Sequence, residues 1–510
     1  MNKKAYQRKV FLLIGFISVL RLIIASVAEL GNDESYYWTY SHFLQWNYFD
    51  HPPMVAIWIR IFTANLWLQN YVVFLRLGSI VGAALSTWFI FKCVSTLHSP
   101  RAGWFASCLY TASFYAGITA GLFIMPDSPQ MVFWTFSLWM IVRITLDDEN
   151  WQNWILFGIA SGLCIMSKVH GVFIWFGFGT YILIYKKTWL LNPRLYVAVI
   201  LSVLIFCPII IWNIRHDFVT YRFHAERVVI HGLAINWYGF FKEVVSQLMI
   251  NNIFNVLLIL SGLFTWVKYP KGKSNALAVF NFIGMPLAII LLFISLFRET
   301  FPHWSGPAYI SLIPLAAIRL ADMNKDIFPK ILRWSIAIYI IFLIGCPLLI
   351  SFYPGTLGSK ASSNMGYGDM SLDMYGWEKA GKKFDSLYHK EVNEGISPAA
   401  TPVICYKWWG SHLQYYFCRP SGIQMIGLGS MNDLHQYMWM NEMNKDKVNF
   451  TNAYCIVPSD ERYNVNEQYA AYYTKVDSIA NFEILRGKLP SHSFSIYRLT
   501  GWKGEVPVEK

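Results

Sequence analysis

The chain has 510 residues, of which 55% are hydrophobic and 17% aromatic, and only 14% are charged. Ordinary soluble domains carry roughly 25% charged residues, so this composition argues against a soluble protein and indicates that the chain lies in a lipid bilayer. The net charge of +12 comes from short clusters of Lys and Arg between apolar stretches and not from one basic face. This distribution argues against a nucleic-acid partner.

Apolar segments long enough to cross a bilayer follow one another along the chain up to residue 352. The first, at residues 11–28, contains Arg21 and has no small-residue cleavage pattern after it, so we expect a membrane helix and not a signal peptide. An unpaired charge inside an apolar segment is costly, so we expect both Arg21 and Arg76 to have a partner. The pattern predicts about eleven transmembrane helices. Their centres lie near residues 20, 82, 110, 136, 160, 177, 203, 260, 286, 312 and 341.

The loops between these segments differ in charge. Lys and Arg precede the first segment and recur in alternate later loops, which by the positive-inside rule face the cytoplasm. The opposite loops, beginning with a first outer loop at residues 30–71, and the C-terminal tail then lie outside. We therefore expect a multi-pass protein of the cell's inner membrane with an extracytoplasmic active site. The basic clusters are Lys3, Lys4, Arg8 and Lys9; Lys186, Lys187 and Arg194; and Lys268, Lys271 and Lys273.

The composition changes after the last apolar segment. Gly and Ser gather just after it, as in a linker, and short apolar runs further on predict strands. Met374, Trp377, Phe384 and Leu387 recur at roughly helical spacing and predict a helix among the strands. The expected strands are at 402–406, 453–457, 482–485 and 494–499. The predicted organisation is a transmembrane domain at 1–352, a linker at 353–369 and a small extracytoplasmic α/β domain at 370–510.

Two adjacent carboxylates, Asp33 and Glu34, open the first outer loop directly after a hydrophobic segment. A functional interpretation makes Asp33 a general base, because a hydroxyl acceptor must lose its proton as it attacks. The alternative is that the pair caps an interfacial helix, since acidic side chains are favoured in any first helical turn. The same choice arises at Asp127, a lone carboxylate between Pro126 and Pro129 at the outer end of a predicted span.

Cations gather on the same predicted side of the membrane. Taken singly, each is more often a residue that reaches from a helix end to the interface than a ligand. Together they are typical of an anion site, and a lipid phosphate fits because fixed cations stabilise the negative charge that a departing phosphate gains. The candidates are Lys168, His170, Arg215, His216, Arg298 and His303.

The order and spacing of these landmarks are similar to those of a known family. The chain resembles membrane glycosyltransferases of the GT-C type, in the protein O-mannosyltransferase and aminoarabinose-transferase superfamily, which is glycosyltransferase family 39/83-like. The resemblance covers most of the chain. It rests on Asp33-Glu34, Asp50-His51-Pro52-Pro53, Pro126-Asp127-Ser128-Pro129, Ser167-Lys168, the segment 213–217, and Pro302-His303-Trp304 followed by Pro307-Ala308-Tyr309.

The resemblance implies a GT-C-like helical membrane protein that transfers a sugar with inversion from a polyprenyl-phosphate carrier. It implies that Asp33 is the catalytic acidic residue of the first loop, with Glu34 beside it, and that Asp127 is the second acidic position. His51, which precedes Pro52, is implied to face the donor phosphate where some relatives carry Lys. Branches of the family differ in metal dependence, and we see no third ligand for Asp33 and Asp127.

We therefore predict a glycosyltransferase with catalytic residues Asp33, Glu34 and Asp127. The predicted donor-phosphate site consists of His51, Lys168, Arg215, His216, Arg298 and His303. We assign no metal site, because no cysteines have paired metal-type spacing and a divalent cation lacks support. The acceptor could be a lipid, a glycan or a protein, and the sugar is not specified. The alternatives are a transporter or flippase of lipid-linked sugars and a non-catalytic membrane protein that binds envelope glycans. Pairing among Cys405, Cys418 and Cys455 is also left open.

Overall fold

The computed structural model of the chain describes residues 3–230, 232, 234–323 and 328–504. The extreme ends of the predicted domains, at 1–2 and 505–510, lie outside these residues. Contacts divide the chain into two compact units, Met1–Ser26 with Leu44–Leu343 and Val27–Phe43 with Ile344–Lys510. The second unit thus takes in the start of the predicted first outer loop.

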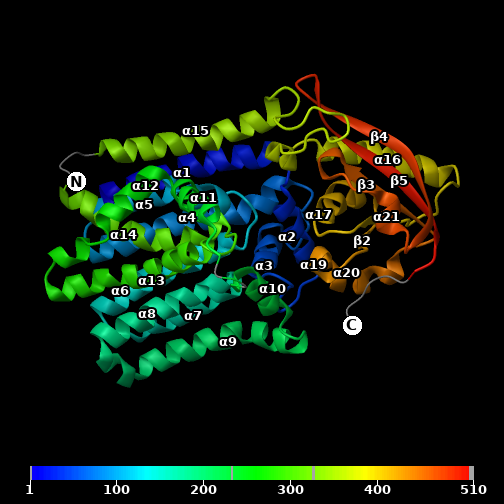
Figure 1. Ribbon diagram of the computed structural model, residues 1–510. Helices are drawn as coiled ribbons and strands as arrows, with labels where there is room; N and C mark the ends of the chain where they lie inside the picture. The colour runs from blue at the N-terminus through cyan, green and yellow to red at the C-terminus, as the bar shows by residue number, and fades with distance from the viewer. Residues whose placement is uncertain (1–2, 231, 233, 324–327, 505–510) are drawn as a thin grey trace. The chain divides into compact units, whose positions relative to one another are not determined.

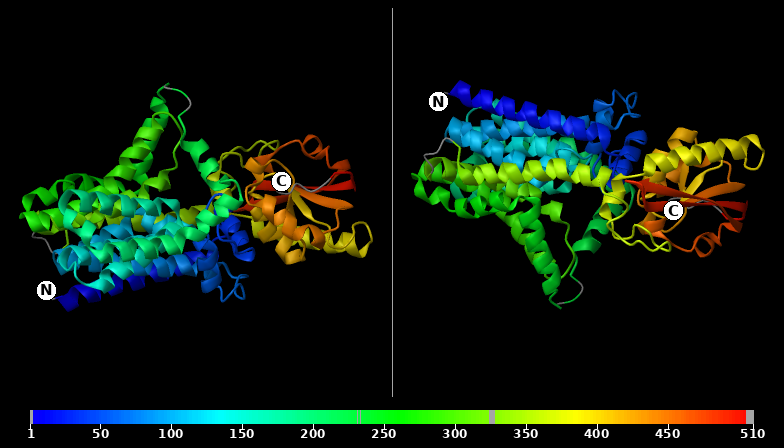
Figure 2. Two further views of the ribbon diagram at one scale, coloured as in Figure 1. Left: turned by 90° about the horizontal axis from the view of Figure 1, so that it is seen from below. Right: turned by 90° about the horizontal axis from the view of Figure 1, so that it is seen from above.

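The first unit is a bundle of long helices that lie side by side (Figures 1 and 2). Helix α4 packs against α5 and α6, α7 against α6 and α9, and α13 against α8 and α14. The helices are α1 (Lys3–Val27), α3 (Met54–Phe62), α4 (Val72–Leu97), α5 (Pro100–Ala112), α6 (Asp127–Leu146), α7 (Trp151–Ser167), α8 (Val172–Tyr185), α9 (Pro193–Arg215), α10 (Val219–Val228), α11 (Trp237–Ile250), α12 (Ile253–Gly262), α13 (Lys271–Ser295), α14 (Gly306–Met323) and α15 (Lys330–Phe352).

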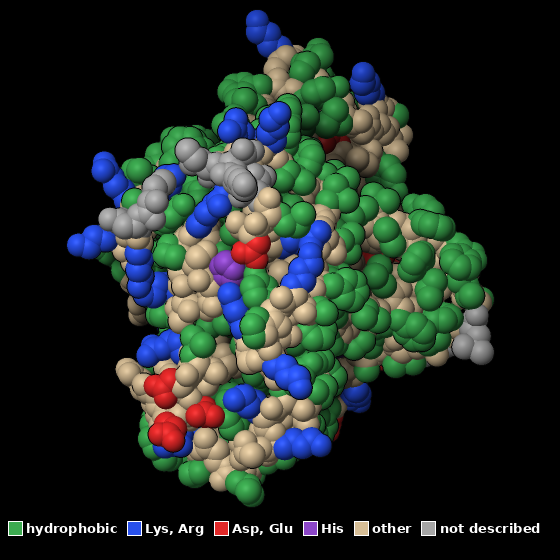
Figure 3. Space-filling model, turned by 90° about the vertical axis from the view of Figure 1, so that its left-hand side faces the viewer, with side chains coloured by type: hydrophobic (Ala, Val, Ile, Leu, Met, Phe, Trp, Pro, Cys, Tyr) green, Lys and Arg blue, Asp and Glu red, His purple; other side chains and the backbone are tan. Residues whose placement is uncertain are grey.

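Several of these helices have the length and composition of membrane spans. Among the described residues 5 helices qualify, namely α1, α4, α9, α13 and α15, and α11 with α12 make a further candidate that is bent by 96°. The predicted multi-pass helical architecture is confirmed, whereas the number of about eleven spans stays a prediction. Figure 3 views the end of the molecule where the N-terminus lies, and Lys and Arg are more abundant there than Asp and Glu.

The arginines inside the predicted spans are buried and held by neighbouring groups, as expected. Arg21 donates from Nε to the Gly117 carbonyl at 3.0 Å and from Nη2 to the Tyr339 hydroxyl at 3.1 Å. A Cβ on Gly117 would lie 2.4 Å from Cε2 of Tyr339, so glycine allows this close approach. Arg76 lies over the Phe123 ring, 5.8 Å from its centroid. These contacts compensate charges that would otherwise be costly in an apolar bundle.

The second unit contains a sheet with strand order β2-β1-β3-β5-β4. Strand β1 pairs in parallel with β2 and β3, and the remaining pairs are antiparallel. All four predicted runs lie on strands, and β2 is an additional strand that was not predicted. The strands are β1 (Val403–Cys405), β2 (Met425–Gly427), β3 (Asn452–Pro458), β4 (Tyr473–Arg486) and β5 (Leu489–Trp502).

Helices cover this sheet on both faces (Figure 2). Side chains alternate along β3, so that Tyr454 contacts Phe384 of α16 (Trp377–Asn393) while Ala453 and Cys455 pack in a core with Tyr469 of α21 (Val465–Tyr469). The predicted helix near Trp377 is confirmed as α16. The other helices are α2 (Asn32–His42), α17 (Gly410–Leu413), α18 (Arg419–Ser421), α19 (Met431–Leu434) and α20 (Tyr437–Asn444).

The segment predicted as a linker, 353–369, is bonded into the second unit. Arg486 is fully buried and donates from Nη2 to Asp369 at 2.9 Å and from Nε to the Gly355 carbonyl at 2.8 Å. These bonds fix both ends of the segment to the end of β4. Cys405, Cys418 and Cys455, whose pairing the sequence left open, are buried free thiols.

Candidate active site

A buried ion pair joins two residues that the sequence singled out. Asp127 is the first residue of α6, and Lys168 follows the end of α7. The Lys168 Nζ donates to Oδ1 of Asp127 at 3.0 Å and to Oδ2 at 2.8 Å. The two side chains are 0% and 3% exposed. Removing two charges from water is expensive, so a pair of this kind needs an arrangement that compensates both partners.

Local structure supplies that arrangement. Asp127 lies at the N-terminus of α6, where the helix dipole favours a negative charge, and Lys168 lies at the C-terminus of α7, where it favours a positive one. The Tyr115 hydroxyl donates to Oδ1 of Asp127 at 2.8 Å. Tyr115 opens a single π-helical turn, Tyr115–Thr119, just beyond α5. Such turns re-aim side chains within a helix and are frequent at functional sites.

Gly306 lets Tyr115 reach this position. Gly306 is the first residue of α14, and a Cβ built on it would lie 2.2 Å from Cδ1 of Tyr115. That separation is far below any van der Waals contact, so every side chain larger than hydrogen would displace the ring. The start of α14 and the turn after α5 therefore act together to hold the hydroxyl against Asp127.

Histidines from separate segments lie in the electrostatic field of Lys168. Burial lowers the pKa of His51 well below its usual value, with further contributions from Lys168, His224 and His303. Burial also lowers the pKa of His303 to about 4, with Lys168 acting in the same direction and Asp127 opposing it. These imidazoles are thus neutral at physiological pH and belong to one group with Lys168, together with His170.

Contacts around His224 tie the first outer loop to this group. The His224 Nε2 bonds the Asp50 carbonyl at 2.7 Å, and its ring centroid lies 6.0 Å from that of His51. Burial lowers the pKa of His224 as well. On the other side, the ring of His170 lies 6.2 Å from Trp304, next to His303 in the chain. The buried Nδ1 of His170 has no hydrogen-bond partner among the described residues.

Of the three remaining predicted phosphate ligands, two have other partners. His216 bonds the Trp212 carbonyl through Nδ1 at 2.8 Å and stacks on the Trp212 ring with centroids 3.9 Å apart. Arg298 donates to the Glu226 carbonyl at 2.7 Å. Arg215 is exposed at the end of α9. In the described part of the chain, no hydrogen bond joins Arg215 or Arg298 to Asp127 or Lys168.

The carboxylates of the first outer loop lie on α2, in the second unit. Glu34 is buried, and its Oε2 accepts the Gly31 backbone N–H at 3.0 Å, so the capping alternative describes its contact. Asp33, beside it in the first turn of the same helix, is exposed. Of the two, Asp33 is the solvent-exposed carboxylate.

Sequence reasoning missed Tyr115, His224 and Gly306. A tyrosine or a glycine is common inside an apolar segment, so neither Tyr115 nor Gly306 stands out in the sequence as a functional residue. His224 lies among other polar residues, and nothing in the sequence distinguishes it from them. Among the described residues no group of three or more His, Cys, Asp or Glu side chains could hold a metal ion.

Comparisons with known proteins relate this chain to glycosyltransferases. The dolichyl-phosphate-mannose-protein mannosyltransferase family model matches residues 50–212. Lipid A galacturonosyltransferase RgtD of Rhizobium johnstonii is 22% identical over 323 residues, which are 63% of this chain and 66% of that protein. An undecaprenyl phosphate-alpha-4-amino-4-deoxy-L-arabinose arabinosyl transferase of Pectobacterium carotovorum is 30% identical over 138 residues, which are 26% of this chain and 24% of that one. The chain thus matches just under two thirds of the first relative and about a quarter of the second.

Solved structures match over almost the whole chain. ArnT from Cupriavidus metallidurans in the apo state has a TM-score of 0.63 at 12% identity, covering 97% of this chain and 98% of ArnT. The same protein bound to undecaprenyl phosphate gives a TM-score of 0.59 at 13% identity, with 96% and 97% covered. These findings confirm the predicted fold.

The contact between Gly306 and Tyr115 can be tested by adding one methyl group. We expect Gly306→Ala to displace Tyr115 from Asp127 and to lower stability by about 1–3 kcal/mol, as overpacking of a filled core does. The measurement is the melting temperature of the detergent-purified protein. Gly179→Ala is the matched control, because Gly179 lies inside α8 with nothing within 4 Å of its added Cβ. Equal melting temperatures for the Gly306→Ala and wild-type proteins would contradict the packing described.

Proposed function

We propose that this membrane glycosyltransferase of the GT-C type transfers a sugar, with inversion, from a polyprenyl-phosphate donor to a hydroxyl group on a lipid, glycan or protein acceptor. The observation that carries the proposal is the buried Lys168–Asp127 pair with neutral histidines gathered around it. The names of the relatives support the donor class, because the arabinosyl transferase uses an undecaprenyl phosphate sugar.

The pair and the histidines fit a phosphate group chemically. A lysine ammonium has three N–H donors, and Lys168 directs bonds to both oxygens of Asp127, so it can still donate to an incoming anion. Neutral imidazoles donate from one ring nitrogen and can gain a proton when an anion arrives. In the proposal Asp127 orients Lys168, Lys168 and His51 contact the donor phosphate, and His303 contributes to the same site.

Fixed donors at this place would act mainly on the transition state. As the bond between the sugar and the phosphate breaks, negative charge grows on the phosphate oxygens. Preorganised cations and N–H groups in a site without bulk water stabilise that charge more than they stabilise the ground state. Asp33 would take the proton from the acceptor hydroxyl as that hydroxyl attacks the sugar.

The proposed location is the extracytoplasmic face of the cell's inner membrane. The excess of Lys and Arg at the N-terminal end of the molecule supports a cytoplasmic position for that end (Figure 3). Asp127 and Lys168 lie at the helix ends opposite the basic loop that contains Lys186 and Lys187. Placing the chemistry outside is consistent with a lipid A galacturonosyltransferase among the relatives.

Transfer assays with radiolabelled polyprenyl-phosphate sugars test the proposal directly. Purified protein in lipid nanodiscs should transfer or hydrolyse at least one donor of the panel, and Asp33→Asn should lower the rate by about 10²–10⁴-fold, the usual contribution of a general base. Donor affinity should change little, because Asp33 acts on the acceptor. Asp147→Asn is the matched control, an exposed carboxylate at the far end of α6.

Two results would contradict the proposal. Full transfer by a folded Asp33→Asn protein would remove Asp33 from catalysis. Donor movement across the membrane without transfer to any acceptor would favour the transporter or flippase.

The histidines predict a pH dependence of donor binding. The pKa of His303 is about 4 without ligand, and a bound phosphodiester raises it, so binding takes up protons. Affinity should therefore rise as pH falls from about 8 towards 5, by at most tenfold per pH unit for each histidine that becomes charged. Calorimetric titration of a polyprenyl-phosphate sugar measures this slope.

The control is a pair of histidine substitutions. His303→Gln should flatten the slope, whereas His389→Gln, on the exposed face of α16, should leave it unchanged. A slope that is identical in wild type and His303→Gln would exclude His303 from the donor site.

A further inference from the structure

The turn between β4 and β5 lies against the end of α15, inside the second unit. Residues 344–352 of α15 belong to this unit. A Cβ built on Gly487, in the turn, would lie 3.1 Å from the Cα of Pro354 and 3.6 Å from the Phe352 carbonyl oxygen. Figures 1 and 2 both show the turn beside the last residues of α15. The turn is therefore level with the point where this helix ends.

The end of α15 marks a depth in the bilayer. The helix has the composition of a membrane span, and its 23 residues extend about 35 Å, close to the hydrocarbon thickness of about 30 Å. Phe352 is its last residue and is 73% exposed. Arg486, next to the turn, donates from Nη1 to the Ile350 carbonyl at 3.2 Å, just inside that end. The turn thus lies at the depth where hydrocarbon meets the lipid head groups.

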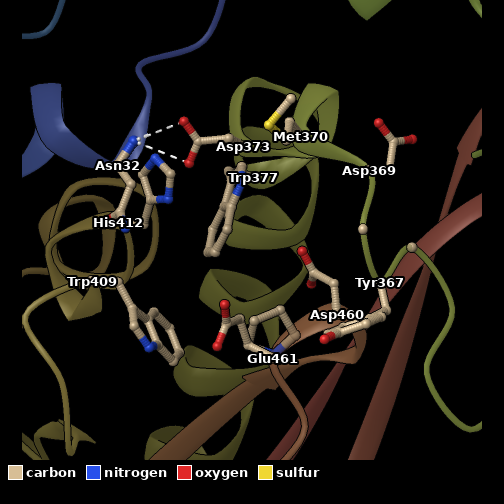
Figure 4. Close-up of a pocket in the computed structure, with 13 residues that line it drawn as sticks. Asn32, Tyr367, Asp369, Met370, Asp373, Trp377, Trp409, His412, Asp460 and Glu461 are labelled. Atoms are coloured by element: carbon tan, nitrogen blue, oxygen red, sulfur yellow. Dashed lines mark hydrogen bonds between the residues drawn. The ribbon is translucent and has the colours of Figure 1, made fainter. Parts of the chain in front are cut away.

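A buried ion pair fixes the turn at this depth. Arg486 bonds Asp369 and the Gly355 carbonyl, and it also donates from Nη1 to Ser371 Oγ at 2.7 Å. Asp369 borders a cavity of about 240 Å³, but its carboxylate turns away from the centre of that cavity (Figure 4). Breaking a buried pair leaves an uncompensated charge and is strongly destabilising. The pair therefore holds the end of α15, the segment 355–371 and the turn in one geometry.

Large apolar side chains around this ion pair are exposed. They form the turn patch, which consists of Phe352, Leu357, Leu485 and Leu489. The Leu357 N–H bonds Oδ2 of Asp369 at 2.8 Å, the same oxygen that Arg486 contacts. The Cβ of Leu489 lies 3.3 Å from the place that a Cβ on Gly355 would take. A single exposed leucine needs no explanation, but apolar side chains gathered around a rigid ion pair indicate an interaction surface.

The turn adds a cation beside this patch. Gly487 and Lys488 are the residues between β4 and β5, and their φ angles are 56° and 70°. Positive φ at both central positions is typical of a type I′ hairpin turn. This left-handed conformation costs energy for a lysine, and strain of this kind gathers at functional positions. The turn leaves Lys488 exposed next to Leu489.

We propose that the turn patch inserts into the membrane surface at which α15 ends and anchors the second unit to the bilayer. The leucine side chains enter the hydrocarbon boundary, and Lys488 reaches the lipid phosphates, as basic residues do at membrane interfaces. The occupant is the bilayer and not a second protein, because the patch continues the exposed apolar surface that Leu348, Leu349 and Phe352 form on α15. This anchor does not depend on the transfer reaction.

Fluorescence quenching by lipids tests the insertion. A cysteine replaces Leu489 in the full-length protein, with Cys207→Ser and Cys346→Ser added because the other described cysteines are buried. The cysteine carries the fluorophore NBD, and the protein is placed in phosphatidylcholine nanodiscs in which some lipids carry a nitroxide on the upper acyl chain. The Leu489→Cys label should lose at least half of its fluorescence to these lipids.

Two reference positions calibrate the quenching. Ile396 is 45% exposed and follows α16, whose last turn bonds Arg498, at the far end of the hairpin, through Glu391 at 3.1 Å. An Ile396→Cys label is the matched control and should keep its fluorescence. Ile341 is 66% exposed within α15, so an Ile341→Cys label should be quenched.

The cation is tested in the Leu489→Cys protein. Lys488→Glu should weaken quenching of the Leu489→Cys label about twofold, because lipid phosphates repel a carboxylate, whereas Lys488→Arg should leave it unchanged. Equal quenching in the Lys488→Glu and Lys488→Arg proteins would exclude Lys488 from the contact.

Three outcomes overturn the anchor. Quenching at Leu489 no stronger than at Ile396 shows a patch in water. An unquenched Ile341 label shows that α15 does not cross the bilayer. Blue-shifted emission at Leu489 without quenching by lipid shows that a protein surface, such as a second copy, covers the patch. Each variant is used only with a wild-type melting temperature, and Leu485→Cys replaces Leu489→Cys if that protein does not fold.

Discussion

The buried ion pair between Asp127 and Lys168 is the constraint on which the first unit depends. Two charges without water are stable only if their geometry is fixed beforehand, because desolvation costs several kcal/mol per ion. Two helix ends, the Tyr115 hydroxyl and the space left by Gly306 meet that requirement together. An apolar bundle retains such a pair at a high energetic cost, which makes the pair a candidate for function.

In the proposed donor site, neutral histidines beside a lysine would respond to the ligand. Without an anion, burial and the charge of Lys168 lower the pKa of His51 and His303, so both are uncharged and the site avoids an excess of positive charge. A bound phosphate would reverse that balance, and the imidazoles would then take up protons. The second unit presents the opposite case, since its cavity gathers carboxylates and aromatic rings with no cation among the described lining residues.

The sequence was informative where a residue type was unusual for its surroundings. Asp127 and Lys168 were found because single charges interrupt apolar segments, and the strands of the second unit because apolar runs alternate with turns. Their pairing was not predictable, since the two residues are 41 positions apart and only the packing of α6 on α7 brings them together. Tyr115 and Gly306 could not be predicted from the sequence for a different reason. Their roles come from the close steric contact between them, which only the folded structure shows. The membership of α2 in the second unit was also missed, since contacts with α17 decide it.

The measurement that tests the central claim most directly is the affinity of undecaprenyl phosphate for Lys168→Met, Asp127→Asn and the double variant, with wild type as reference. If Lys168 binds the donor phosphate, Lys168→Met should bind at least tenfold more weakly, and removing Asp127 as well should not restore binding. The double variant buries no charge, so it separates phosphate binding from the cost of an unpaired carboxylate. Wild-type affinity in the double variant would show that Lys168 serves only to neutralise Asp127 and would contradict the account.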